Sequence, residues 1–256
     1  ELVTEALDGF LRGQEGQVSR LDGFPHIKVV VRTDWKFDQV AIISGGGSGH
    51  EPAHIGFVGK GMLTAAVCGE IFASPSVEAV LAGILAVTGE KGCLLIVKNY
   101  TGDRLNFGLA AEKARACGLN IKMVIVDDDI SLPDDVQARG LAGTLFIHKI
   151  AGFLAEEGKS LDEIFDTTQS LIPLISSIGV SIDNCTVPGM LKDERITEGM
   201  AELGLGIHGE PGRELIAFEN AGSIMKIILS HLQSKMNKDQ KYALILNNLG
   251  GCTPLE

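Results

Sequence analysis

The sequence is poor in aromatic residues, and its basic residues form no cluster. Phenylalanine, tryptophan and tyrosine make up 5% of the 256 residues. This low share favours an α/β protein packed with alanine, isoleucine, leucine and valine over a β-sandwich. Lysine and arginine number 22 against 33 aspartates and glutamates, a net charge of −11. Because an acidic surface repels phosphate backbones, we expect no direct binding to nucleic acid.

Paired cysteines and long apolar runs are lacking too. The five cysteines include no Cys-x-x-Cys pair, which argues against a zinc ribbon and against a disulfide framework. The longest uncharged run, residues 167–182, contains Pro173, Gly179 and several serines, so it is too interrupted to span a bilayer. With no signal peptide in view either, we expect a cytoplasmic protein with free thiols and no membrane contact.

Glycine, in contrast, is abundant. The 32 glycines are about one residue in eight, against a usual share of roughly 7%. Four of them fall in Ser44–Pro52, directly after the strand-like run Val40–Ile43. Glycines in series accept positive φ and expose backbone N–H groups, and parallel sheets bind ligands beyond the carboxyl ends of their strands. We predict a ligand-binding loop with His50 beside it; the alternative is a tight strand-to-helix turn.

This glycine stretch does not have the form of a standard nucleotide site. It lacks the lysine of the Gly-x-x-x-x-Gly-Lys-[Ser/Thr] loop, and His50 stands where Gly-x-Gly-x-x-Gly needs its third glycine. The loop therefore suits a phosphate or a triol, and we expect no bound cofactor in this chain.

Predicted strands and helices alternate through most of the chain, which is typical of an α/β fold with a mostly parallel sheet. Pro75 after Ser74 marks a helix start, and Ser160 with Glu163 forms a capping box. Strands are expected at 28–32, 39–43, 92–98, 121–126, 179–185, 201–207 and 242–246, and helices at 2–11, 74–89, 104–117, 140–157, 160–171 and around 224–232.

The change of character after residue 178 predicts two domains. Residues 1–178 are the first α/β domain, which carries the glycine-rich loop. Residues 179–256 are a second α/β domain, and we expect it to be incomplete at Glu256, because a strand followed by Gly-Gly-Cys-Thr-Pro should lead into another helix.

Unusual residues follow three predicted strands: the glycine stretch with His50, Lys98–Asp103, and Gly206–Gly212 with His208. In one parallel sheet these strand ends would meet in a crevice. Two histidines and an aspartate suit a divalent ion in principle, but none has close ligand spacing, so we predict no metal site. The triplet Asp127–Asp129 suits Mg²⁺ less well than a solvated strand end or a helix cap.

The remaining histidines receive no functional role. His148 is interpreted as packed within an apolar helix or exposed at its tip. His26, His54 and His231 carry no functional prediction.

Together these motifs closely resemble the substrate-binding DhaK module of dihydroxyacetone kinases, over nearly the whole chain and in order. The segment Tyr100–Gly108 is closer to the ATP-dependent single-chain kinases than to the phosphotransferase-system subunits. The resemblance implies two α/β domains with mostly parallel or mixed sheets flanked by helices, and usually a homodimer. The motifs are Ser44–Pro52, Lys98–Asp103 with Asn106–Phe107, and Gly206–Gly212, supported by Gly61–Leu63, Cys68–Glu70 and Asn247–Gly251.

The resemblance also implies roles for single residues. His208 matches the histidine that bonds covalently to the ketone carbon of dihydroxyacetone as a hemiaminal, a step that selects a carbonyl over glycerol. Asp103 matches the base for the attacking hydroxyl, and His50 matches the group that hydrogen-bonds the triol and assists proton transfer at the carbonyl oxygen. The predicted substrate-binding set is Gly46, Gly47, Ser48, His50, Lys98, Asp103 and His208.

In this family the nucleotide, ATP with Mg²⁺ or ADP, is held by an all-helical DhaL-like subunit or domain. Other members bind dihydroxyacetone without phosphorylating it and act as coactivators of a transcription regulator. Kinase subunit and sensor therefore remain alternatives. A fatty-acid-binding or purely structural relative is disfavoured by the Gly-Ile-His-Gly motif at Gly206–Gly209.

Overall fold

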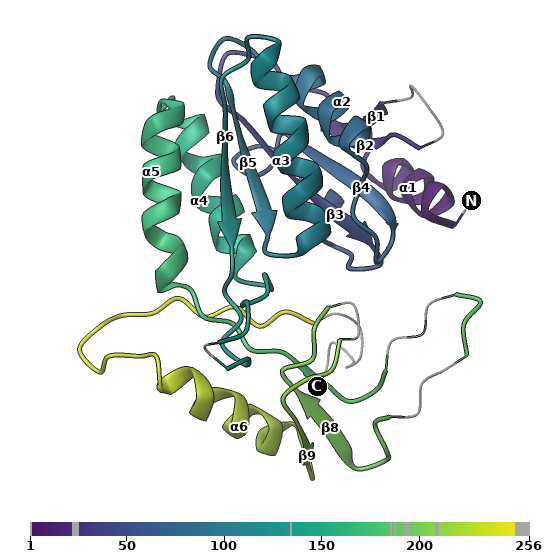
Figure 1. Cartoon of the computed structure of the whole chain (residues 1–256), viewed down its shortest axis with the longest axis vertical. Coiled ribbons are helices and arrows are strands. Elements are labelled where there is room, and N and C mark those ends of the chain that lie inside the picture. The colour runs from purple at the N-terminus through teal and green to yellow at the C-terminus, as the bar shows by residue number, and fades with distance from the viewer. Residues whose placement is uncertain are drawn as a thin grey trace. The chain divides into compact units, whose positions relative to one another are not determined.

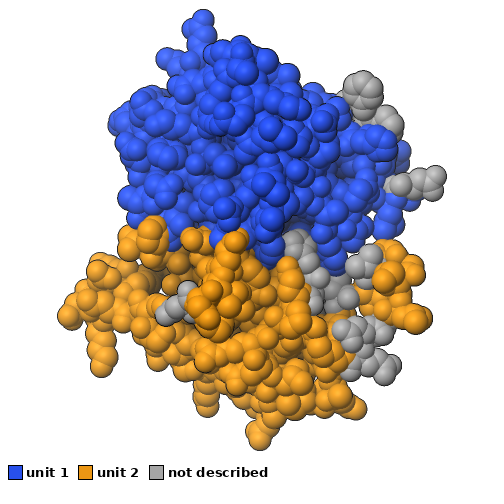
Figure 2. All heavy atoms as spheres, viewed as in Figure 1, with its two compact units in different colours: residues 1–126, 144–172 blue, residues 127–143, 173–256 orange. Residues whose placement is uncertain are grey.

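The chain forms two compact units (Figure 2). Unit 1 comprises residues 1–126 and 144–172, and unit 2 comprises residues 127–143 and 173–256. A domain boundary at residue 178 stays a prediction; the units differ from it in grouping residues 127–143 and 173–178 with the C-terminal part. The computed structural model describes residues 2–21, 26–133, 135–184, 186, 188–191, 195–207 and 210–248.

Unit 1 is built on a six-stranded mixed sheet with the order β1-β2-β4-β3-β5-β6 (Figure 1). The last four of these strands run parallel, whereas β2 pairs antiparallel with β4, and β1 with β2. β5 is buried along its whole length, as its uninterrupted apolar run predicts. The strands are β1 (Val18–Leu21), β2 (Lys28–Arg32), β3 (Ala41–Ser48), β4 (Ala65–Ile71), β5 (Cys93–Lys98) and β6 (Ile121–Val126).

Helices α2 and α3 pack on each other, and Phe107 of α3 shares a core with alternate strand residues, including Ala41, Ile43 and Leu95. Helices α4 and α5 pack on each other and against β5. The predicted α/β class, with a mostly parallel sheet flanked by helices, is confirmed. The helices of unit 1 are α1 (Leu2–Gly13), α2 (Val77–Val87), α3 (Thr101–Ala116), α4 (Thr144–Glu156) and α5 (Leu161–Leu171), with the short 3₁₀ helix η1 (Ile55–Phe57). A second 3₁₀ helix, η2 (Ile172–Leu174), follows α5 at the boundary of the two units.

Helix starts follow local capping chemistry. The capping box predicted at Ser160 is present, because its hydroxyl accepts from the backbone of Glu163 while that carboxylate accepts from the Ser160 N–H. The prediction of Ser74 as the cap of α2 is wrong. Ser76 has the extended backbone that a cap requires, and its side chain accepts from Ala79 N at 3.2 Å.

Unit 2 contains a three-stranded antiparallel sheet with the order β7-β8-β9 and the helix α6, which is capped by Asn220. The strand predicted at 242–246 is wrong: this segment is exposed and pairs with no strand of the described chain. Across the described residues, no helix combines the length and apolar character that a membrane span needs. The elements are β7 (Val180–Ser181), β8 (Met200–Leu203), β9 (Glu214–Ala217) and α6 (Ala221–Gln233).

The glycine stretch is mostly strand, where the sequence predicted a loop. β3 continues to Ser48, in close contact with neighbouring backbone. A Cβ at Gly45 would overlap the carbonyl oxygen of Val67, and a Cβ at Gly47 would lie 2.7 Å from Ala73 N. These two glycines let neighbouring backbone approach closely. Within the stretch only Gly49, with φ of +99°, has the positive φ that the sequence interpretation assigned to it.

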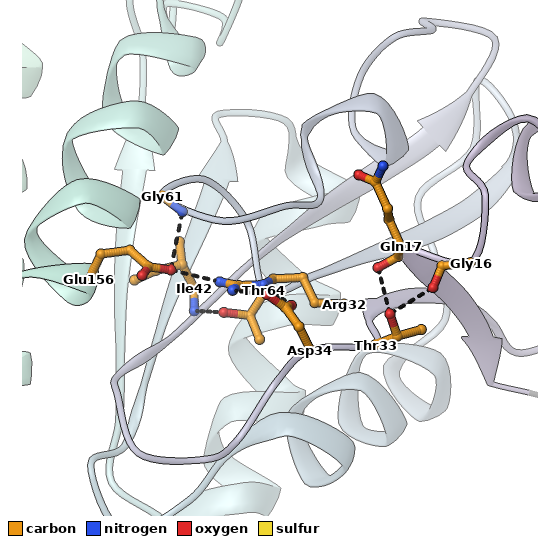
Figure 3. A network of polar contacts seen from close by, with 9 residues as sticks. All are labelled: Gly16, Gln17, Arg32, Thr33, Asp34, Ile42, Gly61, Thr64 and Glu156. Carbon is orange, nitrogen blue, oxygen red and sulfur yellow. Dashed lines mark hydrogen bonds and ion pairs between the residues drawn. The ribbon is translucent and has the colours of Figure 1, made fainter.

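Arg32 at the end of β2 joins distant parts of unit 1 (Figure 3). Its guanidinium donates to Asp34 at 2.8 and 2.9 Å and to Glu156 of α4 at 2.9 Å. Glu156 also accepts from the backbone N–H of Gly61 at 3.2 Å. Burial raises the pKa of Glu156, but the hydrogen bonds from Arg32 and Gly61 outweigh burial and hold this pKa below its ordinary value.

We predict that Glu156→Gln lowers the free energy of unfolding by about 1–3 kcal/mol at neutral pH, because it removes a charged acceptor from a buried cation. A carboxyl group with a lowered folded-state pKa stabilises above its unfolded pKa and loses this contribution as the pH falls through the folded value. As the pH falls below about 4.5, the stability of wild type should therefore decrease more than that of the variant, and the difference between the two should shrink. Urea unfolding across pH measures both effects. Glu157→Gln, at the exposed neighbouring residue, is the control, and an equal loss there would refute the role of Arg32.

We also predict that Gly45→Ala lowers the free energy of unfolding by about 3 kcal/mol or more, since its Cβ would meet a backbone oxygen that cannot move aside. Gly46→Ala is the matched control, because the nearest atom to its Cβ lies 3.5 Å away, an ordinary contact. Thermal unfolding of both variants measures the difference. Equal destabilisation would show that close approach is not what the glycine at position 45 provides.

Candidate functional site

Two of the three predicted strand ends lie at one edge of the unit 1 sheet. β3 and β5 are neighbouring parallel strands, so Ser48 and Lys98 end them on the same side. Helix α3 begins at Thr101, which puts Asp103 in its first turn, where the helix dipole favours a carboxylate. Lys98 and Asp103 are both buried.

The third strand end belongs to a different sheet. Gly206 follows β8, which pairs antiparallel with β7 and β9 in unit 2. The prediction that all three strands end in one parallel sheet is therefore wrong. His208 and Gly209 lie outside the described residues.

Gly46 is the point of β3 around which polar groups of unit 1 gather. A Cβ at this position would lie 3.5 Å from Nε2 of His54 and 3.9 Å from Oδ2 of Asp103. Ser44, on the same face two residues earlier, has its Oγ 3.3 Å from Nδ1 of His54. The absence of a side chain at Gly46 thus leaves backbone exposed to an imidazole and a carboxylate.

His50 and Ser48 are held by the end of β4 and the segment that follows it. The buried His50 ring stacks on Phe72, with centroids 4.9 Å apart and an interplanar angle of 25°. Phe72 itself has φ of +53°, unusual for a residue with a side chain, and its N–H donates to Ser48 O at 2.9 Å. The hydroxyl of Ser48 donates to Gly69 O at 2.8 Å, which commits this side chain to the sheet. Both the hydroxyl and the carbonyl oxygen of Ser48 are therefore hydrogen-bonded to neighbouring backbone.

Charge and burial keep two further histidines neutral. His54 and His148 of α4 are buried with ring centroids 5.4 Å apart. Burial first, and then the positive charge of Lys98, lower the pKa of each well below its ordinary value. Neutral imidazole, ammonium and carboxylate around bare backbone form a setting suited to a small hydroxylated ligand without net charge.

Sequence reasoning missed His54 and Phe72, and for His148 the packed alternative is the one that the structure shows. A second histidine within five residues of His50, still close to the glycines, was the available signal for His54. No local pattern marks Phe72, because its role depends on the stacking partner.

The aspartate triplet serves the backbone of unit 2. Asp128 accepts from Leu141 N at 2.7 Å and from Gly143 N at 2.8 Å, which holds residues 141–143 in a turn, so the helix predicted from Gly140 begins only at Thr144. Asp129 pairs with Arg139 at 2.7 Å. Among the described residues, no three His, Cys, Asp or Glu side chains gather as a metal site would require.

Comparison with known proteins gives close matches. The chain is 52% identical over its whole length to a dihydroxyacetone kinase of Citrobacter freundii, covering 47% of that protein. It is 39% identical to the dihydroxyacetone-binding subunit DhaK of a phosphotransferase-system-dependent kinase of Listeria innocua, covering all of this chain and 78% of the relative. The chain spans about half the length of the first of these relatives.

Solved structures match as well. The crystal structure of the Citrobacter freundii kinase superposes with a TM-score of 0.89 at 53% identity, over 93% of this chain and 44% of the other. A dihydroxyacetone kinase operon co-activator, DhaQ, superposes with a TM-score of 0.84 at 36% identity, over 90% of this chain and 71% of the other. Residues 8–256 match the family model described as the Dak1 domain. With this match over almost its full length, the chain belongs to the Dak1 domain family.

Proposed function

We propose that this chain is the dihydroxyacetone-binding part of a dihydroxyacetone kinase. The observation that carries the proposal is the gathering of His54 and Asp103 about the bare backbone of Gly46, at the sheet edge that also bears Lys98. Support also comes from the 52% identity to a dihydroxyacetone kinase. Dihydroxyacetone is small, uncharged and rich in hydroxyls, as this setting requires.

The proposed first step is covalent capture of the ketone by His208, a role that rests on the sequence resemblance. The lone pair of a neutral ring nitrogen adds to the ketone carbon, and the carbon–oxygen π pair moves to the oxygen. The ring loses its N–H proton and the oxygen gains one with the assistance of His50, so that no atom leaves and a hemiaminal results. Glycerol has no carbonyl and is rejected at this step.

The proposed second step is phosphoryl transfer to a substrate hydroxyl. Asp103 takes the proton of that hydroxyl, and the oxygen then displaces ADP from the γ-phosphorus of ATP to give dihydroxyacetone phosphate. Gly46, Gly47 and Lys98 hold the substrate while this occurs. The reacting oxygen and phosphorus must approach to about 3–3.5 Å, so the phosphoryl donor has to close over the substrate.

The nucleotide partner in this proposal is an all-helical DhaL-like module, either a separate subunit or another part of the same polypeptide. ATP with Mg²⁺ is the proposed donor, because Tyr100–Gly108 reads like the ATP-dependent kinases. A homodimer in the cytoplasm is the proposed setting. Burial raises the pKa of the Cys68 and Cys93 thiols to about 12, which suits unreactive thiols in such a compartment.

A second candidate function is a dihydroxyacetone sensor that acts on a transcription regulator. The observation that favours it is the TM-score of 0.84 to a co-activator of a dihydroxyacetone kinase operon. Affinity capture of the natural protein from its own cells, with and without dihydroxyacetone, separates the two. Capture of a helical nucleotide-binding protein regardless of ligand, or kinase activity of the natural protein itself with ATP and Mg²⁺, supports the kinase. Capture of a DNA-binding regulator only with ligand, and no kinase activity, would replace the kinase by the sensor.

We predict that Asp103→Asn in the active kinase keeps dihydroxyacetone affinity and lowers kcat more than about tenfold, a barrier increase of roughly 1.4 kcal/mol. The amide preserves the shape of the side chain but cannot take the proton. A coupled assay for dihydroxyacetone phosphate and calorimetry measure the two quantities. Asp127→Asn, at an exposed aspartate, is the control. A kcat within a few-fold of wild type would assign the base to another residue.

A further inference from the structure

Two hydrogen bonds fix the tautomer of His54. The hydroxyl of Ser44 donates its one hydrogen to Ile96 O at 2.7 Å. Towards Nδ1 of His54, 3.3 Å away, the same hydroxyl oxygen can therefore act only as an acceptor. Nδ1 carries the proton, and Nε2 presents a lone pair.

This lone pair faces the candidate site. Nε2 lies 3.5 Å from the point where a side chain at Gly46 would begin, and Oδ2 of Asp103 lies 3.9 Å from that point. His54 is buried, and burial together with the charge of Lys98 lowers its pKa well below the ordinary value, so the ring stays neutral and the lone pair remains available. Both groups accept hydrogen bonds, so a hydroxyl donor belongs between them.

We propose that His54 is a further substrate-binding residue, whose Nε2 accepts a hydrogen bond from a substrate hydroxyl held over Gly46 beside Asp103. This inference rests on the proposed dihydroxyacetone binding and deepens it. It gives Gly46 a reason to lack a side chain, because a methyl group there would occupy the place of the hydroxyl. It also makes the site selective for a ligand with a hydroxyl donor at this position, since an apolar group would leave Nε2 buried without a donor.

His148 provides the contrast within the same cluster. It is 1% exposed and packs edge-on to His54, yet neither of its ring nitrogens has a hydrogen-bond partner among the described residues. It also packs against Phe57, with centroids 5.9 Å apart. Its ring fills space, and a phenyl ring would fill that space as well.

Two substitutions at His54 separate the two ring nitrogens. Asn reaches as far as Nδ1, so His54→Asn keeps a donor for Ser44 and loses the acceptor over Gly46. Gln reaches as far as Nε2, so His54→Gln keeps that acceptor and loses the bond to Ser44. The dissociation constant for dihydroxyacetone is measured by calorimetry on the full-length protein, together with the melting temperature. His148→Phe is the matched control.

We expect His54→Asn to weaken dihydroxyacetone binding at least tenfold, His54→Gln to stay within about threefold of wild type, and His148→Phe to bind as wild type with an equal or higher melting temperature. A role of His54 as a structural anchor alone would reverse the order, with Gln the more damaging change. That reversal, or equal binding by all variants, overturns the inference while wild-type binding leaves the proposed function intact. Failure of the wild type to bind dihydroxyacetone overturns both.

Discussion

The close approach of bare backbone along β3 is the constraint on which the candidate site depends. With glycine at 45 and 47, this strand passes against the carbonyl of Val67 and the backbone at Ala73 without side chains to hold them apart. β3 can therefore continue to Ser48 at the same sheet edge where β5 ends at Lys98. Gly46, between Gly45 and Gly47, faces His54 and Asp103. The same run of glycines therefore allows the close packing of the sheet and exposes backbone at the candidate site.

Burial, the dipole of α3 and the charge of Lys98 together decide which groups at this edge carry charge. Lys98 and Asp103 are both buried, and Asp103 has the first turn of α3 to stabilise a carboxylate. The histidines beside them stay neutral, because burial and the Lys98 charge both disfavour an imidazolium. A cation, an anion and neutral acceptors within one small region match the alternating donors and acceptors of a hydroxylated ketone better than they match a phosphate.

The sequence predicted those parts of the fold that local chemistry determines. Apolar runs located β5 and β6, and the capping box at Ser160 located α5. Features that depend on distant partners were predicted wrongly. The glycine run was interpreted as a loop, because its contact with Val67 is not local. Residues 242–246 were interpreted as a strand, although no strand of the described chain pairs with them. In the site, Lys98 and Asp103 do lie at the predicted sheet edge. A functional role for His54 was not predicted, because its neighbours Ser44, Gly46 and His148 come together only in the folded chain.

We propose that this chain captures dihydroxyacetone as a covalent adduct of His208. Nuclear magnetic resonance of the full-length protein, labelled with ¹⁵N at histidine and mixed with dihydroxyacetone carrying ¹³C at the ketone carbon, tests it most directly. We expect a tetrahedral carbon signal with one-bond coupling to a histidine nitrogen, present in wild type and absent in His208→Ala. A bound ligand that shows only the ketone or its hydrate, without carbon–nitrogen coupling, would show that His208 does not capture the ketone covalently.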